Sequence, residues 1–391
     1  MTKQYQFMKP YQFANGAKLQ NHVVMAPVTT QSSFFDGTVS DDEVNFYRMR
    51  SGVGMIIVEV ANINATGKGF EGELSVAEDR FIPGLAKIAN AIHSKGSKAV
   101  LQIFDAGRKT TKEILRGKQP HSASAVAPHR DPENIPVALT EQEIEKIIKD
   151  FGEATRRAIA AGYDGVEIHG ANTYLLQQFF SPHSNQRTDK WGGDVYQRMT
   201  FAKAVIAEVR KVAELYAQDD FIIGYRFSPE ELSKPGITIE DTLKLVDVLS
   251  EEPIDYLHSS MGNRKRTSLI NKEDNETLNH KILHVIAGRK PLIEVGNVQT
   301  PEDVEEALRD GASLVAMGRE LLREPNWIEK VKAGDEKSIR YQLSPVDMEL
   351  VGLPGGLQRE LRTGFLNAMN FTDQKTTSFL NKFGQVEGFG G

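Results

Sequence analysis

The chain has 391 residues, no cysteine and a formal net charge of −6 at neutral pH. The lack of cysteine excludes disulfides, iron–sulfur clusters and thiolate metal sites, and the mild acidity argues against nucleic acid as a partner. The start lacks the apolar core of a signal peptide, and no apolar run reaches the roughly 18 residues of a membrane span, so we expect a globular cytoplasmic protein without a membrane partner.

The first predicted element is a hairpin in YQFANGAKLQ, residues 11–20. Asn15 and Gly16 favour a two-residue type I′ turn because both residue types tolerate positive φ. We expect this hairpin to close the lower mouth of the fold, where it stabilises the protein without taking part in a functional site.

Short runs rich in Val and Ile then alternate with longer amphipathic stretches. Such runs are typical of strands that are covered on both faces. The predicted strands are residues 22–27, 55–60, 98–104, 165–169, 221–227, 255–260, 292–296 and 314–318.

The amphipathic stretches predict helices, and several carry recognisable end signals. Thr140 with Glu143 forms a capping box, and Pro301 occupies a first helical position. The predicted C-cap glycines are Gly96, Gly162 and Gly311. The predicted helices are residues 79–95, 141–161, 196–216, 238–249 and 301–310.

This alternation predicts an α/β fold that is a single (β/α)₈ TIM barrel. A doubly wound sheet is the alternative, but the Gly-rich turn that it needs after an early strand is missing. A barrel takes about 250 residues, so the surplus forms long βα loops and a tail. The predicted loops are 106–139, 170–195 and 260–276. We expect the barrel to occupy residues 1–335, and residues 336–391 to form a C-terminal extension with a flexible glycine-rich end.

Polar residues occupy inward positions on three predicted strands. Because alternate residues of a barrel strand face the interior, Gln102, His169 and Arg226 converge near the carboxyl ends of neighbouring strands. Burial of such groups without partners is costly. Two explanations stay open at this point: ion pairing of Arg226 with Glu59 and Glu167, or a planar polar ligand that lies across the strand ends.

The segment after the fourth strand adds a second group of candidates, His169-Gly-Ala-Asn172-Thr-Tyr174. His169 and Asn172 offer two N–H donors that can polarise one carbonyl oxygen, as an oxyanion hole does. Tyr174 adds a phenol that can protonate carbon as a general acid. A structural histidine is the alternative, and the inward position of His169 on an active-face strand favours the site.

Two glycine-containing pairs follow the last two strands, Gly296-Asn297 and Gly318-Arg319. Barrels frequently bind phosphate with these loops and a helix N-terminus, and an arginine can clamp the anion bidentately. The alternative is that Arg319 only begins a surface helix. The other histidines have no metal-ligand spacing, so we expect no metal site.

Together these motifs resemble the old yellow enzyme family of FMN-dependent NAD(P)H:flavin oxidoreductases and ene-reductases. The most specific stretch is GVEIHGANTYLLQQFFSPHSNQRTDKWGGD at residues 165–194, and VVMAP, LQIFDAGR, GYRFSPEE and the segment 295–325 match in order. The resemblance runs from about residue 5 to residue 333. It implies FMN as cofactor and NADH or NADPH as reductant.

The resemblance also implies residue roles. His169 and Asn172 match the pair that holds the carbonyl of an activated alkene, and Tyr174 matches the proton donor. The implied flavin contacts are Ala26, Pro27, Val28, Thr29, Gln102 and Arg226, with the phosphate on Gly296, Asn297, Gly318 and Arg319.

The implied reaction is a ping-pong transfer of hydride from NAD(P)H through the flavin to an α,β-unsaturated carbonyl compound. Two alternatives remain: a flavin-binding barrel without turnover, and a non-redox TIM-barrel lyase or isomerase. The sequence leaves open the physiological substrate, the preferred nicotinamide and the oligomeric state, a homo-oligomer included.

Overall fold

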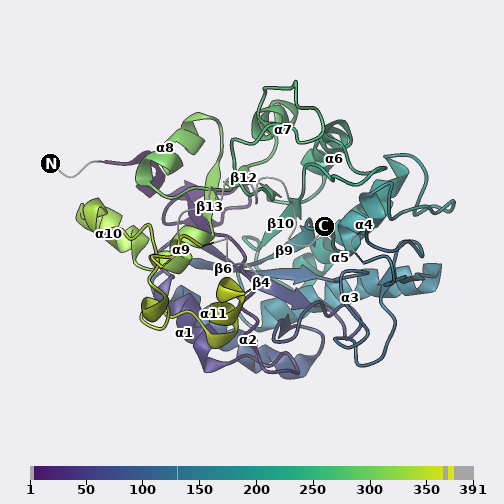
Figure 1. Cartoon of the computed structure of the whole chain (residues 1–391), viewed down its shortest axis with the longest axis horizontal. Coiled ribbons are helices and arrows are strands. Elements are labelled where there is room, and N and C mark those ends of the chain that lie inside the picture. The colour runs from purple at the N-terminus through teal and green to yellow at the C-terminus, as the bar shows by residue number, and fades with distance from the viewer. Residues whose placement is uncertain (1–3, 130, 364–368, 374–391) are drawn as a thin grey trace.

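The computed structural model describes residues 4–129, 131–363 and 369–373. Its centre is a ring of eight parallel strands in the order β3-β13-β12-β11-β10-β9-β6-β4, and the pairing of β3 with β4 closes the ring (Figure 1). The predicted TIM barrel is therefore confirmed. The barrel strands are β3 (Val23–Met25), β4 (Met55–Asn62), β6 (Lys98–Phe104), β9 (Gly165–Gly170), β10 (Ile222–Phe227), β11 (Tyr256–Ser259), β12 (Leu292–Val295) and β13 (Leu314–Met317).

Helices surround this ring and form its outer layer. The longer helices are α1 (Asp41–Met49), α2 (Ile82–His93), α3 (Glu141–Ala160), α5 (Thr200–Tyr216), α6 (Ile239–Glu251), α7 (Leu278–Ile286), α8 (Pro301–Arg309) and α11 (Gly355–Arg362). The shorter α-helices are α4 (Leu175–Phe180), α9 (Arg319–Arg323) and α10 (Trp327–Ala333). Single 3₁₀ turns lie at Gln6–Met8, Asp79–Phe81, Gln197–Met199, Glu336–Ser338 and Pro345–Asp347.

The helix ends follow the predicted signals. Thr140 and Glu143 form the expected capping box of α3, and Pro301 begins α8 after a Thr300 cap. Gly162 and Gly311 follow the C-cap residues of α3 and α8 with φ of 83° and 115°, the left-handed region that glycine tolerates best. The pattern missed α1, α7, α10 and α11, and two predicted helices begin as 3₁₀ turns.

Inward and outward residues pack into separate layers, as strand alternation predicts. Ile222 and Tyr256 pack inside the ring, whereas Ile223 and Leu257 pack against the helices. Short strands of two residues each lie in the loops. They are β1 (Tyr11–Gln12), β2 (Lys18–Leu19), β5 (Leu74–Ser75), β7 (His121–Ser122) and β8 (Val137–Ala138).

The N-terminal hairpin plugs the barrel, but its turn differs from the prediction. Phe13 packs inside the ring with its centroid 6.1 Å from that of Tyr256. Among the described turn residues only Gly16 has positive φ, so the type I′ turn expected for Asn15 and Gly16 is wrong. The amide of Asn15 instead donates to the carbonyl of Phe221, and a longer loop lets Phe13 point into the barrel.

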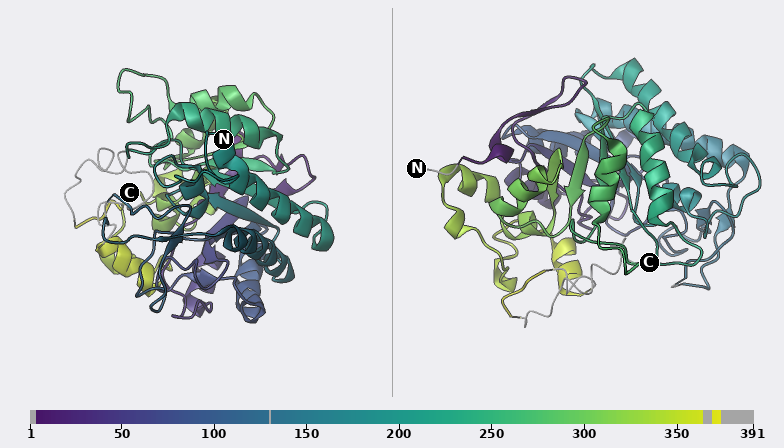
Figure 2. Two further views of the ribbon diagram at one scale, coloured as in Figure 1. Left: turned by 90° about the vertical axis from the view of Figure 1, so that its right-hand side faces the viewer. Right: turned by 90° about the horizontal axis from the view of Figure 1, so that it is seen from above.

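The described part of the C-terminal extension, residues 336–363 and 369–373, folds back over the opposite end of the barrel from the hairpin (Figure 2). Arg50 is fully buried and donates to the carbonyl of Val351 at 2.7 Å, which ties the extension to the barrel. The glycine-rich end, residues 386–391, lies outside the described residues. Within the described ranges, no helix has the length and apolarity needed to cross a membrane.

Candidate active site

One cavity of about 300 Å³ lies at the carboxyl ends of the barrel strands. All thirteen residues singled out from the sequence line it, although they come from six different βα loops and strands. They are Ala26, Pro27, Val28, Thr29, Gln102, His169, Asn172, Tyr174, Arg226, Gly296, Asn297, Gly318 and Arg319. The structure thus brings the whole predicted set together, while the role of each residue stays a prediction.

The cavity wall also contains residues that sequence reasoning missed. Phe70 comes from the β4–β5 loop, Arg323 from α9, and Leu357 and Leu361 from the C-terminal extension. The only sequence signal for Arg323 is its place one turn after Arg319. Phe70 and the two leucines had none, because their approach to the cavity depends on how distant segments fold back.

Glu167 organises the polar floor of the cavity. Its two oxygens accept from Gln102 Nε2 at 2.7 Å, Tyr256 Oη at 3.0 Å and His258 Nδ1 at 2.8 Å. Burial opposes ionisation of Glu167, but the charges of His258 and Arg226 outweigh it and lower its pKa. The carboxylate therefore fixes the Gln102 amide with its nitrogen toward Glu167, which leaves the carbonyl oxygen of Gln102 for another donor.

Arg226 is buried beside this floor without the ion pairs first considered for it. In the described part of the chain, no ion pair within 4 Å joins it to Glu59 or Glu167, and its Nε has no hydrogen-bond partner. Pairing with Glu59 is wrong because β4 shifts register between Val58 and Val60. Glu59 instead accepts from the backbone of Thr30 at 2.8 Å and from Tyr47.

His169 and Tyr174 lie side by side, with ring centroids 5.0 Å apart. Burial, together with the charges of Arg226 and Lys109, lowers the pKa of His169 well below its usual value, so the imidazole is neutral. Its Nδ1 is buried without a partner among the described residues. Burial raises the pKa of Tyr174, so its phenol keeps its proton. Both groups are thus in the form that donates a hydrogen bond or a proton.

Asn172 is held in a strained turn between them. Asn172 and Thr173 have φ of 58° and 64°, a left-handed conformation that asparagine tolerates but that is costly for the β-branched Thr173. Ser260 Oγ donates to Asn172 Oδ1 at 2.9 Å, and the Asn172 backbone N–H donates to Ser228 Oγ at 2.9 Å. The amide oxygen is thereby occupied, and the Asn172 NH₂ group is left as the donor toward the cavity.

Gln178 clamps this turn to the neighbouring loop. Its Nε2 donates to the carbonyls of Thr173 at 2.7 Å and Ala106 at 3.0 Å, and its Oε1 accepts from Arg108 N and Ser122 Oγ. Only 1% of Gln178 is exposed, so all of its hydrogen bonds are internal.

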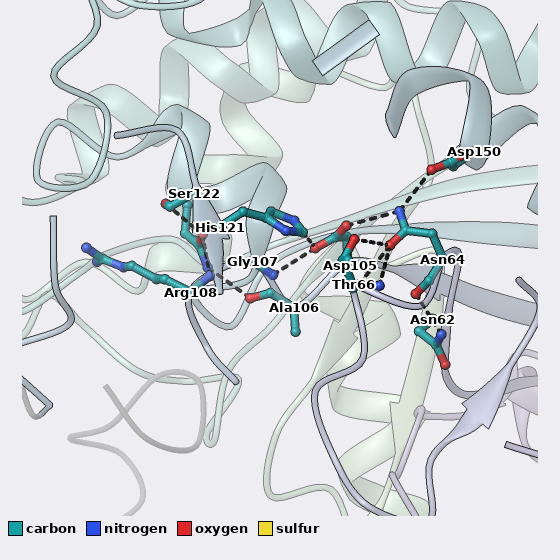
Figure 3. Close-up of polar contacts among 12 residues, drawn as sticks. Asn62, Asn64, Thr66, Asp105, Ala106, Gly107, Arg108, His121, Ser122 and Asp150 are labelled. Atoms are coloured by element: carbon teal, nitrogen blue, oxygen red, sulfur yellow. Dashed lines mark hydrogen bonds and ion pairs between the residues drawn. The ribbon is translucent and has the colours of Figure 1, made fainter. Parts of the chain in front are cut away.

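The loop that follows β6 and contains Ala106 is also held by the buried carboxylate of Asp105 (Figure 3). Asp105 accepts from His121 Nε2 at 2.9 Å and from the Gly107 backbone at 2.8 Å, and Asn64 bridges Asp105 to Asp150. The Asp105 carbonyl also accepts from the backbone of Leu175, next to Tyr174. The position of Tyr174 is thus fixed from two directions.

The corner formed by the loops after β12 and β13 combines closely packed glycine backbone with positive charge. Gly296 has φ of 126°, and an added Cβ would lie 2.6 Å from the backbone nitrogen of Asn263. Arg319 begins α9, yet it lines the cavity and donates to the Gly262 carbonyl. Burial and the neighbouring Arg323 lower the pKa of Arg319 to about 10, so it stays charged.

These features fit FMN. Arg226 Nε and His169 Nδ1 are buried polar atoms that lack partners within the described structure. Three arginines and no carboxylate occur among the described residues that line the cavity, which suits a ligand with a phosphate. Gly318 lines the cavity as well, and its backbone is open to a ligand, because a Cβ there would meet only Ala26 and Val28 at 3.8 Å.

Comparisons with known proteins agree with this interpretation. A family model described as the NADH:flavin oxidoreductase / NADH oxidase family matches residues 6–338. NADH:acrylate oxidoreductase of Vibrio harveyi is 49% identical over 322 residues, which are 81% of this chain and 32% of that protein. A probable NADH-dependent flavin oxidoreductase of Bacillus subtilis is 42% identical over 347 residues, or 88% of this chain and 93% of that one.

Solved structures give the same result for the fold. The old yellow enzyme homologue from Zymomonas mobilis superposes with a TM-score of 0.76 at 25% identity, covering 90% of this chain and 98% of that one. The chain spans only about a third of the length of the acrylate enzyme. The family model alone covers most of the chain, and this protein therefore belongs to the NADH:flavin oxidoreductase / NADH oxidase family of FMN-binding oxidoreductases.

Proposed function

We propose that the protein takes hydride from NADH or NADPH and delivers it to an activated alkene in a ping-pong reaction. The observation that carries this proposal is the convergence of His169, Asn172 and Tyr174 on the same cavity as Gln102 and Arg226. The NADH-dependent relatives support the choice of reductant.

FMN, when bound, supplies acceptance and donation of hydride, which no side chain of the protein can provide. His169 and Asn172 would donate to the carbonyl oxygen of an α,β-unsaturated substrate and stabilise the negative charge that develops there. The neutral imidazole of His169 keeps one N–H for this hydrogen bond. Tyr174 would give its phenolic proton to the α-carbon, while the β-carbon receives the hydride.

The remaining residues would bind and orient the cofactor. We assign the flavin ring to Gln102, Arg226 and the loop of Ala26, Pro27, Val28 and Thr29. The buried guanidinium of Arg226 would stabilise negative charge on the reduced ring. The phosphate is assigned to Gly296, Asn297, Gly318 and Arg319.

We further propose that residues 1–335 form the catalytic barrel and that the extension from residue 336 covers the site. Its membership of the family implies that its ligands are small molecules. We further propose that the protein works in the cytoplasm without nucleic acid or a membrane as partner, because its charge is mildly acidic and its sequence has no long apolar run. A non-redox lyase or isomerase is no longer a candidate function, because the chain belongs to a family of oxidoreductases.

The deciding experiment separates the two half-reactions under anaerobic conditions. FMN-loaded protein mixed with NADH or NADPH should bleach at the flavin absorbance bands, and addition of an enone such as cyclohexenone should restore them. Bleaching that no enone reverses would favour a different electron acceptor. A flavin that neither nicotinamide reduces would indicate a flavin-binding barrel without turnover.

A further inference from the structure

The C-terminal extension places a helix on the cavity, although the family model ends at residue 338. Leu357 and Leu361 are four residues apart on α11, so they share one face of the helix. Both are 3% exposed and both line the cavity. The face that α11 turns toward the cavity is therefore apolar, in contrast to the arginines elsewhere in the wall.

Three contacts tie the extension to the barrel, and two of them, at Arg323 and Ser32, reach elements that border the cavity. Arg323 Nη1 donates to the Tyr341 carbonyl at 2.7 Å, and Arg50 Nη2 donates to the Val351 carbonyl. The Gly356 backbone N–H donates to Ser32 Oγ at 3.1 Å. A Cβ at Gly356 would overlap the carbonyl of Gln31, another cavity residue, so α11 begins in close contact with the loop after β3.

The far end of α11 is fixed as well. Arg362 forms an ion pair with Asp373 at 3.1 Å and lies over the ring of Phe371. Leu343 pairs with Phe371 in an isolated parallel bridge, which returns the chain to the start of the extension. Anchors at both ends give the two leucines a defined position, as a binding surface requires.

We propose that α11 is part of the cofactor site and that Leu357 and Leu361 bind the apolar, dimethyl-substituted end of the flavin. The polar ring edge and the phosphate are matched by the amide and arginine groups already described. The benzenoid end has no hydrogen-bonding groups, and it needs an apolar wall of the kind these leucines provide. The inference rests on FMN as cofactor and does not depend on the alkene substrate.

The test measures FMN affinity of the full chain without turnover. In the double variant Leu357→Ala with Leu361→Ala, the dissociation constant, followed by the fluorescence of released FMN, should rise at least about tenfold, equivalent to about 1.4 kcal/mol. The gain in melting temperature on FMN addition should shrink in parallel. If the double variant does not fold, each single variant is expected to show part of the rise, and Leu→Met at either position should restore tight binding.

The matched control is Leu353→Ala, since Leu353 is equally buried in the same extension but does not line the cavity. It should lower the melting temperature while leaving FMN affinity unchanged. An equal loss of affinity in Leu353→Ala would overturn the proposal, because α11 would then act only through general stability. An unchanged FMN affinity in the folded double variant would also overturn the proposal, even if the KM for the alkene changed. Failure of alkene reduction in the wild type would leave this test intact.

Discussion

The two ends of the cavity are built in opposite ways. The corner after β9 presents neutral donors, His169, Asn172 and Tyr174, on backbone held in a strained turn by internal hydrogen bonds. The corner after β12 and β13 has glycine backbone and the charged Arg319. A group that must aim at a reacting atom needs a fixed direction, whereas an anion is held by charge and space. The comparison predicts that mutations in the two corners separate chemistry from cofactor retention.

The largest effect is expected for Tyr174→Phe, which removes the proposed acid and keeps the ring. Alkene reduction should slow by roughly 10²- to 10⁴-fold, the usual worth of a general acid. Flavin reduction by the nicotinamide should stay within about twofold, since it needs no phenol. Stopped-flow spectroscopy of each half-reaction measures both, and equal losses in the two would contradict the assigned role.

Arg319→Ala should act on the other corner alone. Loss of a half-buried guanidinium beside the phosphate should weaken FMN binding by about 10- to 100-fold, in line with the roughly 1.5–3 kcal/mol of a charged hydrogen bond. The alkene half-reaction of protein saturated with FMN should remain close to wild type. Arg309→Ala on the exposed part of α8 is the matched control. Unchanged FMN retention in Arg319→Ala would remove the phosphate assignment.

Gln178→Met tests whether the clamp positions the donors. The variant keeps the side-chain length but loses the hydrogen bonds to Thr173 and Ala106. We expect kcat for alkene reduction to fall about tenfold with FMN content unchanged, because misplacement of a donor weakens catalysis more than cofactor binding. Gln197→Met, at the exposed first residue of the 3₁₀ turn Gln197–Met199, controls for the substitution itself. A loss of FMN equal to the loss of kcat would assign Gln178 to general stability.

The smallest effect is expected from pH. The pKa of His169 lies well below its usual value and that of Tyr174 well above, so neither changes protonation between pH 7 and 9. The alkene half-reaction should therefore vary by less than about twofold over that range. Acidification below the ordinary histidine pKa of about 6.5 should destabilise the fold, because unfolded His169 takes up a proton that the folded chain resists. A rate that follows a single ionisation near pH 7.5 would refute the neutral imidazole.

Strand alternation was enough to predict which polar residues face the cavity. Alternation predicted that Gln102, His169 and Arg226 converge, because the direction of a side chain depends only on its position along its own strand. The ion pair of Glu59 with Arg226, which was left open as an alternative, does not form, and the register shift within β4 leaves no mark in the sequence. His258 was not among the candidate site residues, although it is the buried partner of Glu167 below the cavity.

Contacts between distant segments account for most of what the sequence did not reveal. Gln178 reaches a loop 70 residues earlier, and Gly356 meets Ser32 across 324 residues of chain. Such contacts depend on the path of whole loops, and no periodicity of neighbouring residues encodes them. The turn at Asn15 is a smaller example of a tertiary contact that local sequence does not predict. The packing of Phe13 inside the barrel outweighs the local preference for a type I′ turn.

The lack of acidic residues in the described cavity wall has a practical consequence for handling the protein. The three arginines that line the cavity attract anions from the buffer whenever the cofactor is absent. Inorganic phosphate and sulfate should therefore slow reconstitution with FMN in proportion to their concentration. A zwitterionic buffer at low ionic strength should give the fastest return of the yellow colour.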